Sequence, residues 1–289
     1  MNLLSKIIAA FEVFALCVGL GVGVACLREP SPGETAGPEE TDPGFVRITT
    51  ATGDASTEPG TTAAVITTAP PATVPEGTKM MYLTFDDGPS KNTPKILKIL
   101  ADYGVKATFF VIHHDESYYQ QYLIDTLAQG HALALHSYTH DYGRIYSSTS
   151  AFWSDLTKLH DEIQQLTGQD IRITRFPGGS SNTVSARYCD GIMTELTGAM
   201  ESRGYQYFDW NCEDGDADGN TMSTEYIINH ARSSANTESE HLVMLCHDTD
   251  AKSTTVDALP SIIEYFRDQG YSFGALDFNS YPAHHGVNN

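Results

Sequence analysis

Two adjacent carboxylates, Asp86 and Asp87, follow an apolar run over residues 80–83 and stand directly before Gly88-Pro89. The run has the composition of a buried strand, so the two acids fall at the carboxyl end of that strand rather than in the core. Because side chains alternate along a strand, neighbouring acids point in different directions and can do different work. One could bind a metal while the other acts as a base. Taken alone, the pair also fits an ordinary strand-to-helix turn with an Asp cap.

Further polar residues follow the later apolar runs of the chain, and they are His136 and His140, Arg175, the acids Asp214, Asp216 and Asp218, and the pair His247-Asp248. The two histidines of the first group are four residues apart, so on a helical turn they share a face and can bind one metal. No Glu follows the first of them, which excludes the helical protease pattern. A lone pair of this kind is often plain surface, but a carboxylate from another strand end completes a site with two histidines and one carboxylate.

The elements that must position these residues alternate between strand-like and helical patterns from residue 79 onward. We predict strands at 80–85, 107–112, 132–135, 172–176, 206–210, 242–246 and 272–275, and helices near 93–103, 117–129, 151–167, 189–203, 224–235 and 256–269. Repeated βα units predict a mainly parallel sheet with right-handed crossovers, as a closed or nearly closed barrel. An open doubly wound sheet is the alternative, but no Gly-rich phosphate loop follows the first strand. Barrels carry their sites at the carboxyl ends of the strands, where the polar residues fall.

Five ordered segments, spread over about residues 78–277, resemble the motifs of the polysaccharide deacetylases, carbohydrate esterase family 4. The segments are Thr84-Phe85-Asp86-Asp87-Gly88, Gly130-His131 leading to His136-Ser137-Tyr138-Thr139-His140, Arg175-Phe176-Pro177-Gly178-Gly179, Trp210-Asn211-Cys212-Glu213-Asp214-Gly215-Asp216 and Leu245-Cys246-His247-Asp248. One such segment is a weak signal, but five in order are specific. The resemblance agrees with a fold of the α/β class, a distorted (β/α)7-type barrel.

The resemblance implies a metal site and a base at the first strand end. Asp87, His136 and His140 would be the metal ligands, and Asp86 would be the general base, paired with Arg175 and held ionised by it. Asp87 should therefore face the histidines, and Asp86 should face the arginine and the attacking water. The ligand set accepts several divalent metals; we expect zinc, with cobalt and nickel as alternatives.

The resemblance also implies an acid and a substrate pocket. His247 would be the general acid, oriented by Asp216, although Asp214 and Asp218 compete for that role. Leu245 would line the pocket for the acetyl methyl group, and a backbone N–H near Gly178 would stabilise the oxyanion.

Two positions depart from the family pattern. Ala217 stands where the fourth motif often ends in Trp, and Gly178 stands where an aromatic residue often follows Pro177. Both changes remove aromatic walls, so we expect a more open substrate groove. Neither touches the metal ligands or the acid–base pair.

The expected activity is therefore that of a metal-dependent polysaccharide deacetylase, a hydrolase that removes N-acetyl groups from N-acetylglucosamine-containing polysaccharide by metal-activated water. Peptidoglycan is the favoured substrate, followed by chitin oligomers and acetylxylan. A non-catalytic module that binds cell-wall glycan is the alternative from another class; it would have lost the base, the acid or a ligand, and none is lost. A hydrolase of small cyclic amides fits an exported chain poorly.

The N-terminal part of the chain predicts export. Residues 1–27 place Lys6 ahead of an apolar stretch, which is typical of a signal peptide or membrane anchor, and a lipid-modified Cys26 is also open. Residues 28–77 are rich in Pro, Thr and Glu and predict a disordered linker. We therefore expect a catalytic domain at 78–280 that is secreted or anchored at the cell surface.

The net charge limits the kinds of binding partner, and the number of cysteines limits what can be said of disulfides. The net charge of −20 argues against nucleic acid or an anionic lipid surface as a partner. Beyond the first 27 residues there are three cysteines, Cys189, Cys212 and Cys246, and an odd number of cysteines does not define a disulfide pairing. We expect Cys212 and Cys246 to act as small buried hydrophobes. Residues 281–289 form a polar tail in which we expect His284-His285 to face solvent.

Overall fold

The computed structural model describes residues 77–219 and 221–289 of the 289-residue chain. The predicted export segment at 1–27, and all but the last residue of the predicted linker at 28–77, lie outside the described residues. Within the described part, none of the helices has the length and apolar character needed to cross a membrane.

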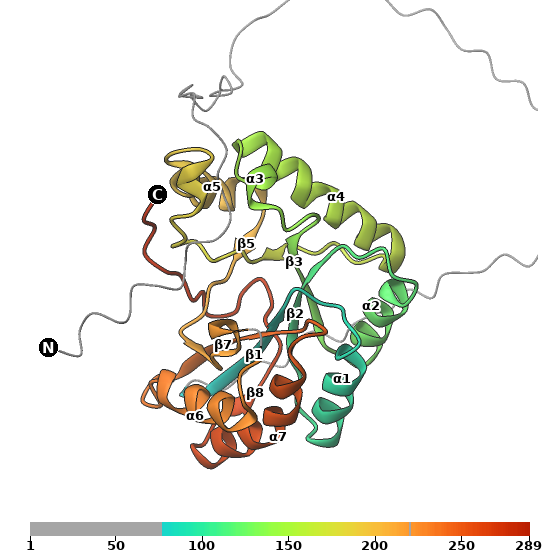
Figure 1. Cartoon of the computed structure of the whole chain (residues 1–289), viewed down its shortest axis with the longest axis vertical. Helices are drawn as coiled ribbons and strands as arrows, with labels where there is room; N and C mark the ends of the chain where they lie inside the picture. Colours follow the sequence, from blue (N-terminus) through green and yellow to red (C-terminus); the bar gives the residue numbers. More distant parts are fainter. Residues whose placement is uncertain (1–76, 220) are drawn as a thin grey trace, which may run out of the picture.

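A parallel sheet forms the centre of the domain (Figure 1). Its strands are β1 (Met80–Asp86), β2 (Thr108–Ile112), β3 (Ala132–Ser137), β4 (Ile173–Thr174), β5 (Gln206–Tyr207), β6 (Cys212–Glu213), β7 (His241–His247) and β8 (Ser272–Phe273). They run in the order β5-β4-β3-β2-β1-β7-β6, with β8 paired to β1, and every pairing is parallel. In the described ranges no ladder joins β5 to β6, so the sheet is a curled, distorted (β/α)7-type barrel whose hydrogen bonds do not close. The predicted fold class is confirmed.

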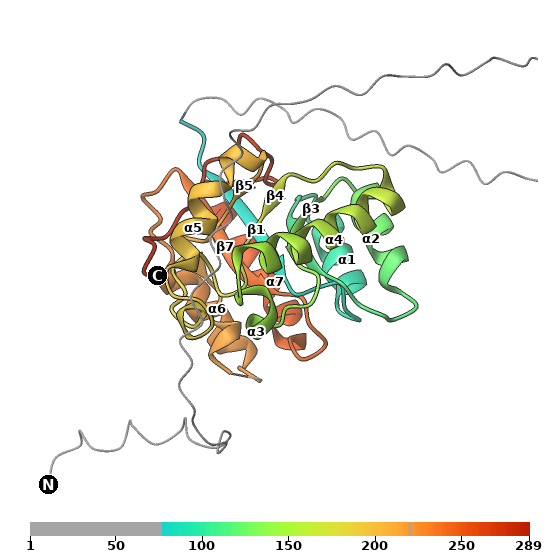
Figure 2. The same ribbon diagram turned by 90° about the horizontal axis from the view of Figure 1, so that it is seen from above.

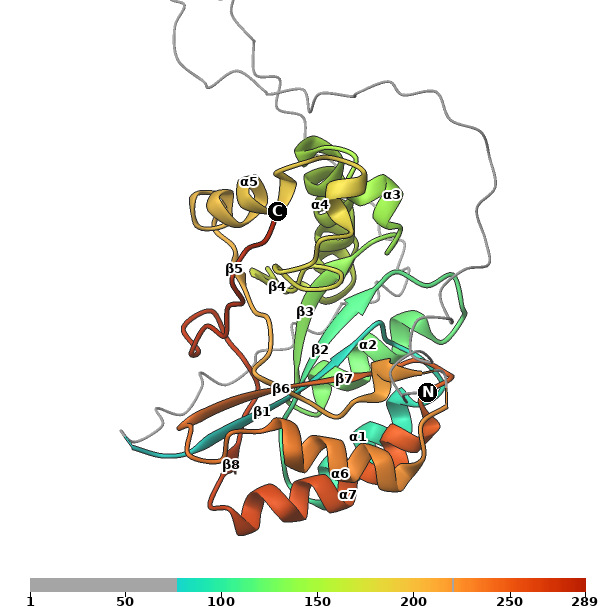
Figure 3. The same cartoon turned by 60° about the vertical axis from the view of Figure 1, so that its left-hand side comes forward.

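The helices cover the outside of this sheet: α1 (Thr93–Asp102), α2 (Tyr119–Ala128), α3 (Tyr142–Ile145), α4 (Thr149–Thr167), α5 (Ile192–Ala199), α6 (Thr224–Ser234) and α7 (Ser253–Asp268). Helices α2 and α4 pack against β3 (Figure 2), and α6 lies alongside α7 (Figure 3). Helix α4 shows why the sequence folds this way. Its apolar residues recur at helical spacing and are buried, Ser148 caps its first turn, and Gly168 ends it at φ 73°.

The structure shortens three predicted strands, and β8, predicted at 272–275, spans Ser272–Phe273. The ladders of β4 and β5 span two residues each, against predicted ranges of 172–176 and 206–210. Just beyond β5 the Phe208 N–H still bonds the Thr174 carbonyl of β4, but the carbonyls of Phe208 and Asp209 accept hydrogen bonds from Arg175 Nε and Nη2 instead of from a strand. Strand β6 and helix α3 carry no periodic signal of their own and were not predicted.

The C-terminal residues 281–289 pack against the domain, as Figure 3 shows for the segment that runs from β8 past β5 to α5. The Asp209 N–H donates to the Ala283 carbonyl, and the Asn289 carbonyl accepts from Thr194 N. The expectation for His284-His285 is wrong for the second residue: His285 is half-buried, its N–H bonds Asp209 Oδ2, and its Nε2 lies 2.7 Å from the Trp210 carbonyl. Cys212 and Cys246 are free, buried thiols, as predicted.

Candidate active site

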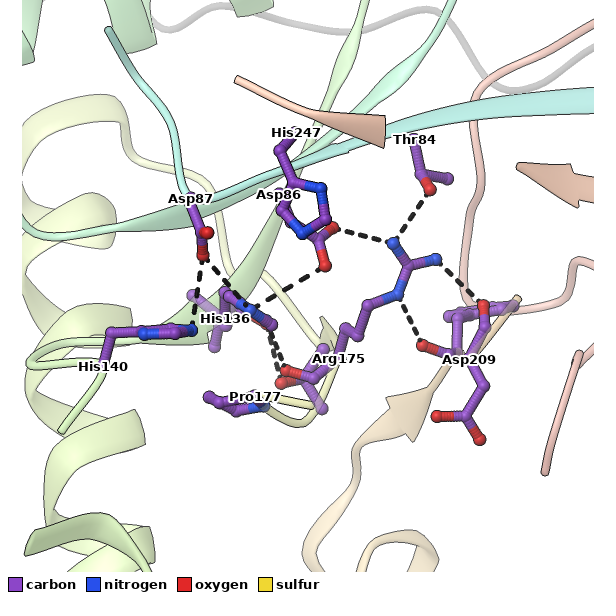
Figure 4. A network of polar contacts seen from close by, with 12 residues as sticks. Thr84, Asp86, Asp87, His136, His140, Arg175, Pro177, Asp209 and His247 are labelled. Carbon is purple, nitrogen blue, oxygen red and sulfur yellow. Dashed lines mark hydrogen bonds and ion pairs between the residues drawn. The ribbon is translucent and has the colours of Figure 1, made fainter. Parts of the chain in front are cut away.

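Three potential metal ligands converge at the carboxyl end of the sheet (Figure 4). Asp87 directly follows β1, His136 lies in β3, and His140 lies in the loop after β3. Asp87 Oδ1 is 3.5 Å from His136 Nε2 and 3.4 Å from His140 Nε2. Bonds of about 2.0–2.1 Å to a single ion separate neighbouring ligand atoms by roughly 3.0–3.4 Å. The spacing of these donor atoms therefore fits one small divalent cation, as expected of residues that share a ligand cluster.

The hydrogen bonding and charge of two of the donor atoms, Asp87 Oδ1 and His136 Nε2, also suit a bound cation. Asp87 Oδ1 is buried and has no hydrogen-bond partner among the described residues, which leaves its charge uncompensated. His136 Nδ1 donates to the Arg175 carbonyl at 2.8 Å, so its Nε2 lone pair faces the cluster. Burial lowers the pKa of His136 to about 3, with the positive charges nearby acting in the same direction and Asp87 opposing them. A neutral imidazole is the form that binds metal.

The loop that carries His140 is not the helical turn expected from the four-residue spacing. His140 has φ 50°, and the loop is held by Asp155 of α4, which the sequence analysis did not single out. The Asp155 carboxylate accepts from Ser137 Oγ, from the backbone N–H groups of Tyr138 and Thr139, and from Thr139 Oγ1, at 2.7 to 3.0 Å. A carboxylate that bonds several loop donors replaces the hydrogen bonds that a helix would supply. Asp155 therefore fixes the spacing of the two histidines.

Asp86 pairs with Arg175, as the family resemblance implied, and its other carboxylate oxygen, Oδ2, lies 3.8 Å from His136 Nε2 of the ligand cluster. Its Oδ1 lies 2.7 Å from Arg175 Nη1, and both side chains are almost completely buried. The guanidinium also donates to Thr84 Oγ1 and lies over the Phe110 ring. Burial raises the pKa of the Asp86 carboxyl above its ordinary value, and the charges of Arg175 and His247 offset part of that rise. A carboxylate with a raised pKa is better suited to accept a proton than an ordinary surface acid.

His247 pairs with Asp216 rather than with the two competing acids. Its Nδ1 lies 2.6 Å from Asp216 Oδ1, and its backbone N–H donates to Asp216 Oδ2 at 2.8 Å. Asp214 bonds the backbone N–H of Asp216 instead, and Asp218 contacts Tyr226 on the surface. Burial lowers the pKa of His247, but the hydrogen bond and charge of Asp216, helped by the charges of Asp86 and Asp87, outweigh it and raise that pKa to about 9. His247 therefore holds a proton on Nε2 at neutral pH.

A buried carboxylate behind His247 joins two of the loops. Asp248 Oδ1 accepts from Ser90 Oγ at 2.7 Å, and its Oδ2 accepts from Thr93 Oγ1 at 2.5 Å. Its backbone N–H donates to the Asp86 carbonyl. These bonds tie the end of β7 to the β1–α1 loop, and thus hold the candidate acid beside the candidate base. Burial raises the pKa of Asp248 to about 6.

The predicted substrate-contacting residues lie at the same edge of the sheet. Leu245 is buried in β7, two residues before His247. Gly178 lies in a turn with φ 78°, and the carboxylate of Asp209 accepts hydrogen bonds from Ser180 N and Oγ, two residues further on. The expected opening of the groove is wrong at Gly178, because the Tyr142 hydroxyl fills the space beside it: a Cβ built on Gly178 would lie 2.6 Å from that oxygen. At Ala217 the side chain is exposed, and the aromatic wall is absent there.

Sequence reasoning missed three supporting residues: Asp155, Asp209 and His114. His114 has its Nε2 3.1 Å from the Asp87 carbonyl and thereby supports the end of the strand that carries the ligand. None of the three belongs to a motif segment. The only available signal was that each is a hydrogen-bonding side chain within a few residues of a helix or strand end, which does not distinguish them from many others.

The chain is similar to known proteins in both sequence and fold. Residues 73–190 match the family model described as polysaccharide deacetylase. The chain is 43% identical to the catalytic domain of peptidoglycan N-acetylglucosamine deacetylase from Eubacterium rectale, with a TM-score of 0.70 over 76% of this chain and 99% of that one. It is 31% identical to a CE4 esterase from Streptococcus mutans, with a TM-score of 0.61 over 70% and 87% of the two chains. It is 28% identical to a peptidoglycan-N-acetylglucosamine deacetylase from Bacillus cereus, covering 70% of this chain and 71% of that protein.

Proposed function

The chain belongs to the polysaccharide deacetylase family, carbohydrate esterase family 4, and we propose that it removes N-acetyl groups from the N-acetylglucosamine residues of peptidoglycan. The observation that carries the proposal is the convergence of two separate dyads, Asp86–Arg175 and Asp216–His247, on one three-residue ligand cluster. The similar Eubacterium rectale domain is named for this substrate, and its whole length is covered by this chain.

The family is metal-dependent, and we propose Zn²⁺ as the native ion, with Co²⁺ or Ni²⁺ as functional substitutes. Asp87, His136 and His140 would hold it, because their donor atoms form the cluster described above. When bound, a divalent cation supplies Lewis-acid polarisation of the substrate carbonyl and lowers the pKa of water. The neutral nitrogen, nitrogen and carboxylate oxygen donor set suits these borderline ions better than Mg²⁺ or Ca²⁺.

The side chains of this chain would then perform hydrolysis in two proton transfers. Asp86 accepts a proton from the attacking water as the water oxygen bonds to the carbonyl carbon. The backbone N–H of Gly178 donates to the carbonyl oxygen, where negative charge develops. As the carbon–nitrogen bond breaks, His247 Nε2 donates its proton to the leaving nitrogen, and the products are acetate and a free amine. An amine is a poor leaving group without that proton.

The remaining site residues would act through these groups or bind the acetyl group. Arg175 holds Asp86 in place through the buried ion pair, and Asp216 fixes the ring of His247 and keeps it protonated. Leu245 would contact the acetyl methyl group, because its side chain lies on the strand that carries the acid. These roles support deacetylation rather than binding alone.

Acetate release is the test of this proposal. Purified protein, loaded with Zn²⁺, is incubated with peptidoglycan, N-acetylated chitin oligomers and acetylxylan, each with and without a chelator. We expect metal-dependent acetate release from the first, and Asp86→Asn protein serves as the inactive control. If wild-type protein releases no acetate from any of the three, the enzymatic proposal fails. If it binds peptidoglycan without turnover, the chain is a wall-binding module.

We further propose that the chain is exported and held at the cell surface or secreted. The support is the sequence of residues 1–27 alone, with Lys6 preceding an apolar stretch. Fractionation of cells that express the full chain, followed by detection in membrane, wall and medium, tests this. Recovery of the full-length protein only from the cytoplasm would contradict it.

A further inference from the structure

Gly178 has no side chain, and the side chain of Tyr142 from α3 lies in the space beside it. Gly178 has φ 78°, and a Cβ at that position would lie 2.6 Å from Tyr142 Oη and 3.4 Å from Tyr142 Cε1. The Tyr142 hydroxyl thus occupies the space in which a side chain at residue 178 would begin. A glycine in motif three and a tyrosine after motif two are therefore one structural arrangement rather than two unrelated residues.

Tyr142 is fixed in this place by its own surroundings. It is the first residue of α3, whose start is capped by Asp141 through the N–H groups of Gly143 and Arg144. Its ring packs edge-on against His140, at 5.7 Å between ring centroids, and against Tyr146, at 5.5 Å. Tyr146 in turn donates to the Pro177 carbonyl at 2.8 Å, so the ring of Tyr142 and the turn beside it share one support. The hydroxyl is therefore positioned by packing before any substrate arrives.

Two hydrogen-bond donors beside one another have no acceptor in the described part of the chain. Neither the Gly178 N–H nor the Tyr142 O–H makes a hydrogen bond to another described residue, whereas the neighbouring Gly179 N–H bonds the Phe176 carbonyl. The ring of Tyr142 packs against His140, a candidate metal ligand, so the phenol lies beside the candidate metal site. Gly178 is exposed and Tyr142 is half-buried, so both donors are accessible to an arriving substrate, whose carbonyl oxygen is an acceptor with room for more than one donor.

We propose that the Tyr142 hydroxyl is a substrate-contacting catalytic group that donates to the acetyl carbonyl oxygen alongside the Gly178 N–H. The inference rests on the proposed function. In the transition state the carbonyl oxygen gains negative charge, and a donor that is already in place stabilises it without reorganisation. A side chain at residue 178 would exclude the hydroxyl from this position, so the arrangement requires a glycine there. The same phenol ring replaces the wall that an aromatic at 178 would provide.

The test is steady-state kinetics of Tyr142→Phe, which keeps the ring and removes the hydroxyl. Loss of one preorganised donor reduces kcat by about 10²–10³-fold in known cases, so we expect a fall in kcat of at least about tenfold with little change in KM. Zinc content per chain and the melting temperature should remain those of wild type, because no contact of the hydroxyl supports the fold. Tyr122→Phe on α2 is the matched control and should keep wild-type kinetics.

A double-mutant cycle gives a second test that does not depend on one variant. Gly178→Ala brings a Cβ against Tyr142 Oη and should lower kcat. In Tyr142→Phe/Gly178→Ala the contact at 2.6 Å is gone, and the nearest remaining atoms are Asn182 Cβ at 3.3 Å and a ring carbon at 3.4 Å. The combined loss should therefore be smaller than the product of the two single losses. A product that is fully multiplicative would show that the two residues act independently.

The remaining outcomes separate this inference from the proposed function. Wild-type protein that releases no acetate overturns the proposed function itself. Active wild-type protein with an unchanged Tyr142→Phe kcat overturns only the role of the hydroxyl. A raised KM at unchanged kcat would assign Tyr142 to the sugar rather than to the carbonyl, and loss of zinc in the variant would assign it to support of the metal site; both results overturn the proposal.

Discussion

Asp86 of β1 and His247 of β7 are register partners on adjacent parallel strands. The pairing places the candidate base and the candidate acid side by side at one edge of the sheet, although they lie far apart in the sequence (Figure 4). Each has its own buried partner of opposite charge: Arg175 pairs with Asp86, and Asp216 pairs with His247. A sheet register, rather than a local motif, therefore sets the geometry between the two proton-transfer groups.

Removal of either proton-transfer group should abolish most of the activity and spare the metal site. We expect Asp86→Asn and His247→Ala to lower kcat about 10²–10⁴-fold, the usual contribution of a positioned acid or base. Neither residue belongs to the ligand cluster, so zinc content should remain near one per chain. Acetate release and metal analysis on the same samples check this. A His247→Ala variant with kcat within a few-fold of wild type would show that another group protonates the nitrogen.

Asp216→Asn should shift the alkaline limb of the pH profile. The acid must hold its proton, so activity is present below the pKa of His247, about 9, and is lost as the pH rises through it. Replacing Asp216 by a neutral amide removes the main group that raises this pKa, and the limb moves toward lower pH. The measurement is kcat/KM from pH 6 to 10, with exposed Asp218→Asn as the control. An unchanged limb would mean that a different group titrates.

Loss of one ligand should remove metal and activity together. We expect His140→Ala to lower zinc affinity strongly, because the cluster would keep only two protein donors. Chelator treatment of wild-type protein should abolish acetate release, and added Zn²⁺ or Co²⁺ should restore it. His230→Ala, a half-buried histidine on α6, serves as the control. Full activity of chelated wild-type protein would contradict a metal-dependent reaction in this chain.

Asp155 should matter for metal binding although it is not a ligand. Asp155→Ala leaves the donors of the loop between His136 and His140 without their acceptor, so the second histidine is no longer held at its distance from Asp87. Loss of such a supporting carboxylate typically costs about 10- to 100-fold in metal affinity. Competition titration with a zinc chelator measures the effect. Asp155→Asn keeps an acceptor oxygen, so its zinc affinity should lie between those of wild type and Asp155→Ala. Wild-type affinity in the alanine variant would show that the loop is held by other contacts.

Arg175 should contribute to stability as well as to the site. Arg175→Leu removes the partner of a fully buried carboxylate, and an uncompensated buried charge costs about 3–5 kcal/mol. We expect a lower urea midpoint at pH 7, and a smaller loss at low pH where Asp86 is neutral. The double variant Arg175→Leu/Asp86→Leu should recover part of the loss. Equal stability of the single variant and wild type would show that the pair is not electrostatically coupled to folding.

The order of the elements and most of the candidate site were predictable, because both depend on patterns of residues that are close together in the sequence. Apolar runs, helix caps and terminal glycines gave the strands and helices within a few residues. The polar residues at the strand ends gave Asp86, Asp87, His136, His140 and His247. Strands β4 and β5 were overestimated because their apolar composition does not reveal that the carbonyls of Phe208 and Asp209 bond the Arg175 guanidinium rather than a neighbouring strand.

The sequence by itself determined the class of fold, the family and the candidate ligand set, since each depends on residue types at fixed spacings along the chain. Tertiary structure alone decided which acid pairs with His247, what holds His140 in place and what fills the space beside Gly178. Those answers come from Asp216, Asp155 and Tyr142, side chains that meet their partners across loops and neighbouring elements. Such contacts depend on how the strands and helices pack in space, and no spacing along the sequence encodes them.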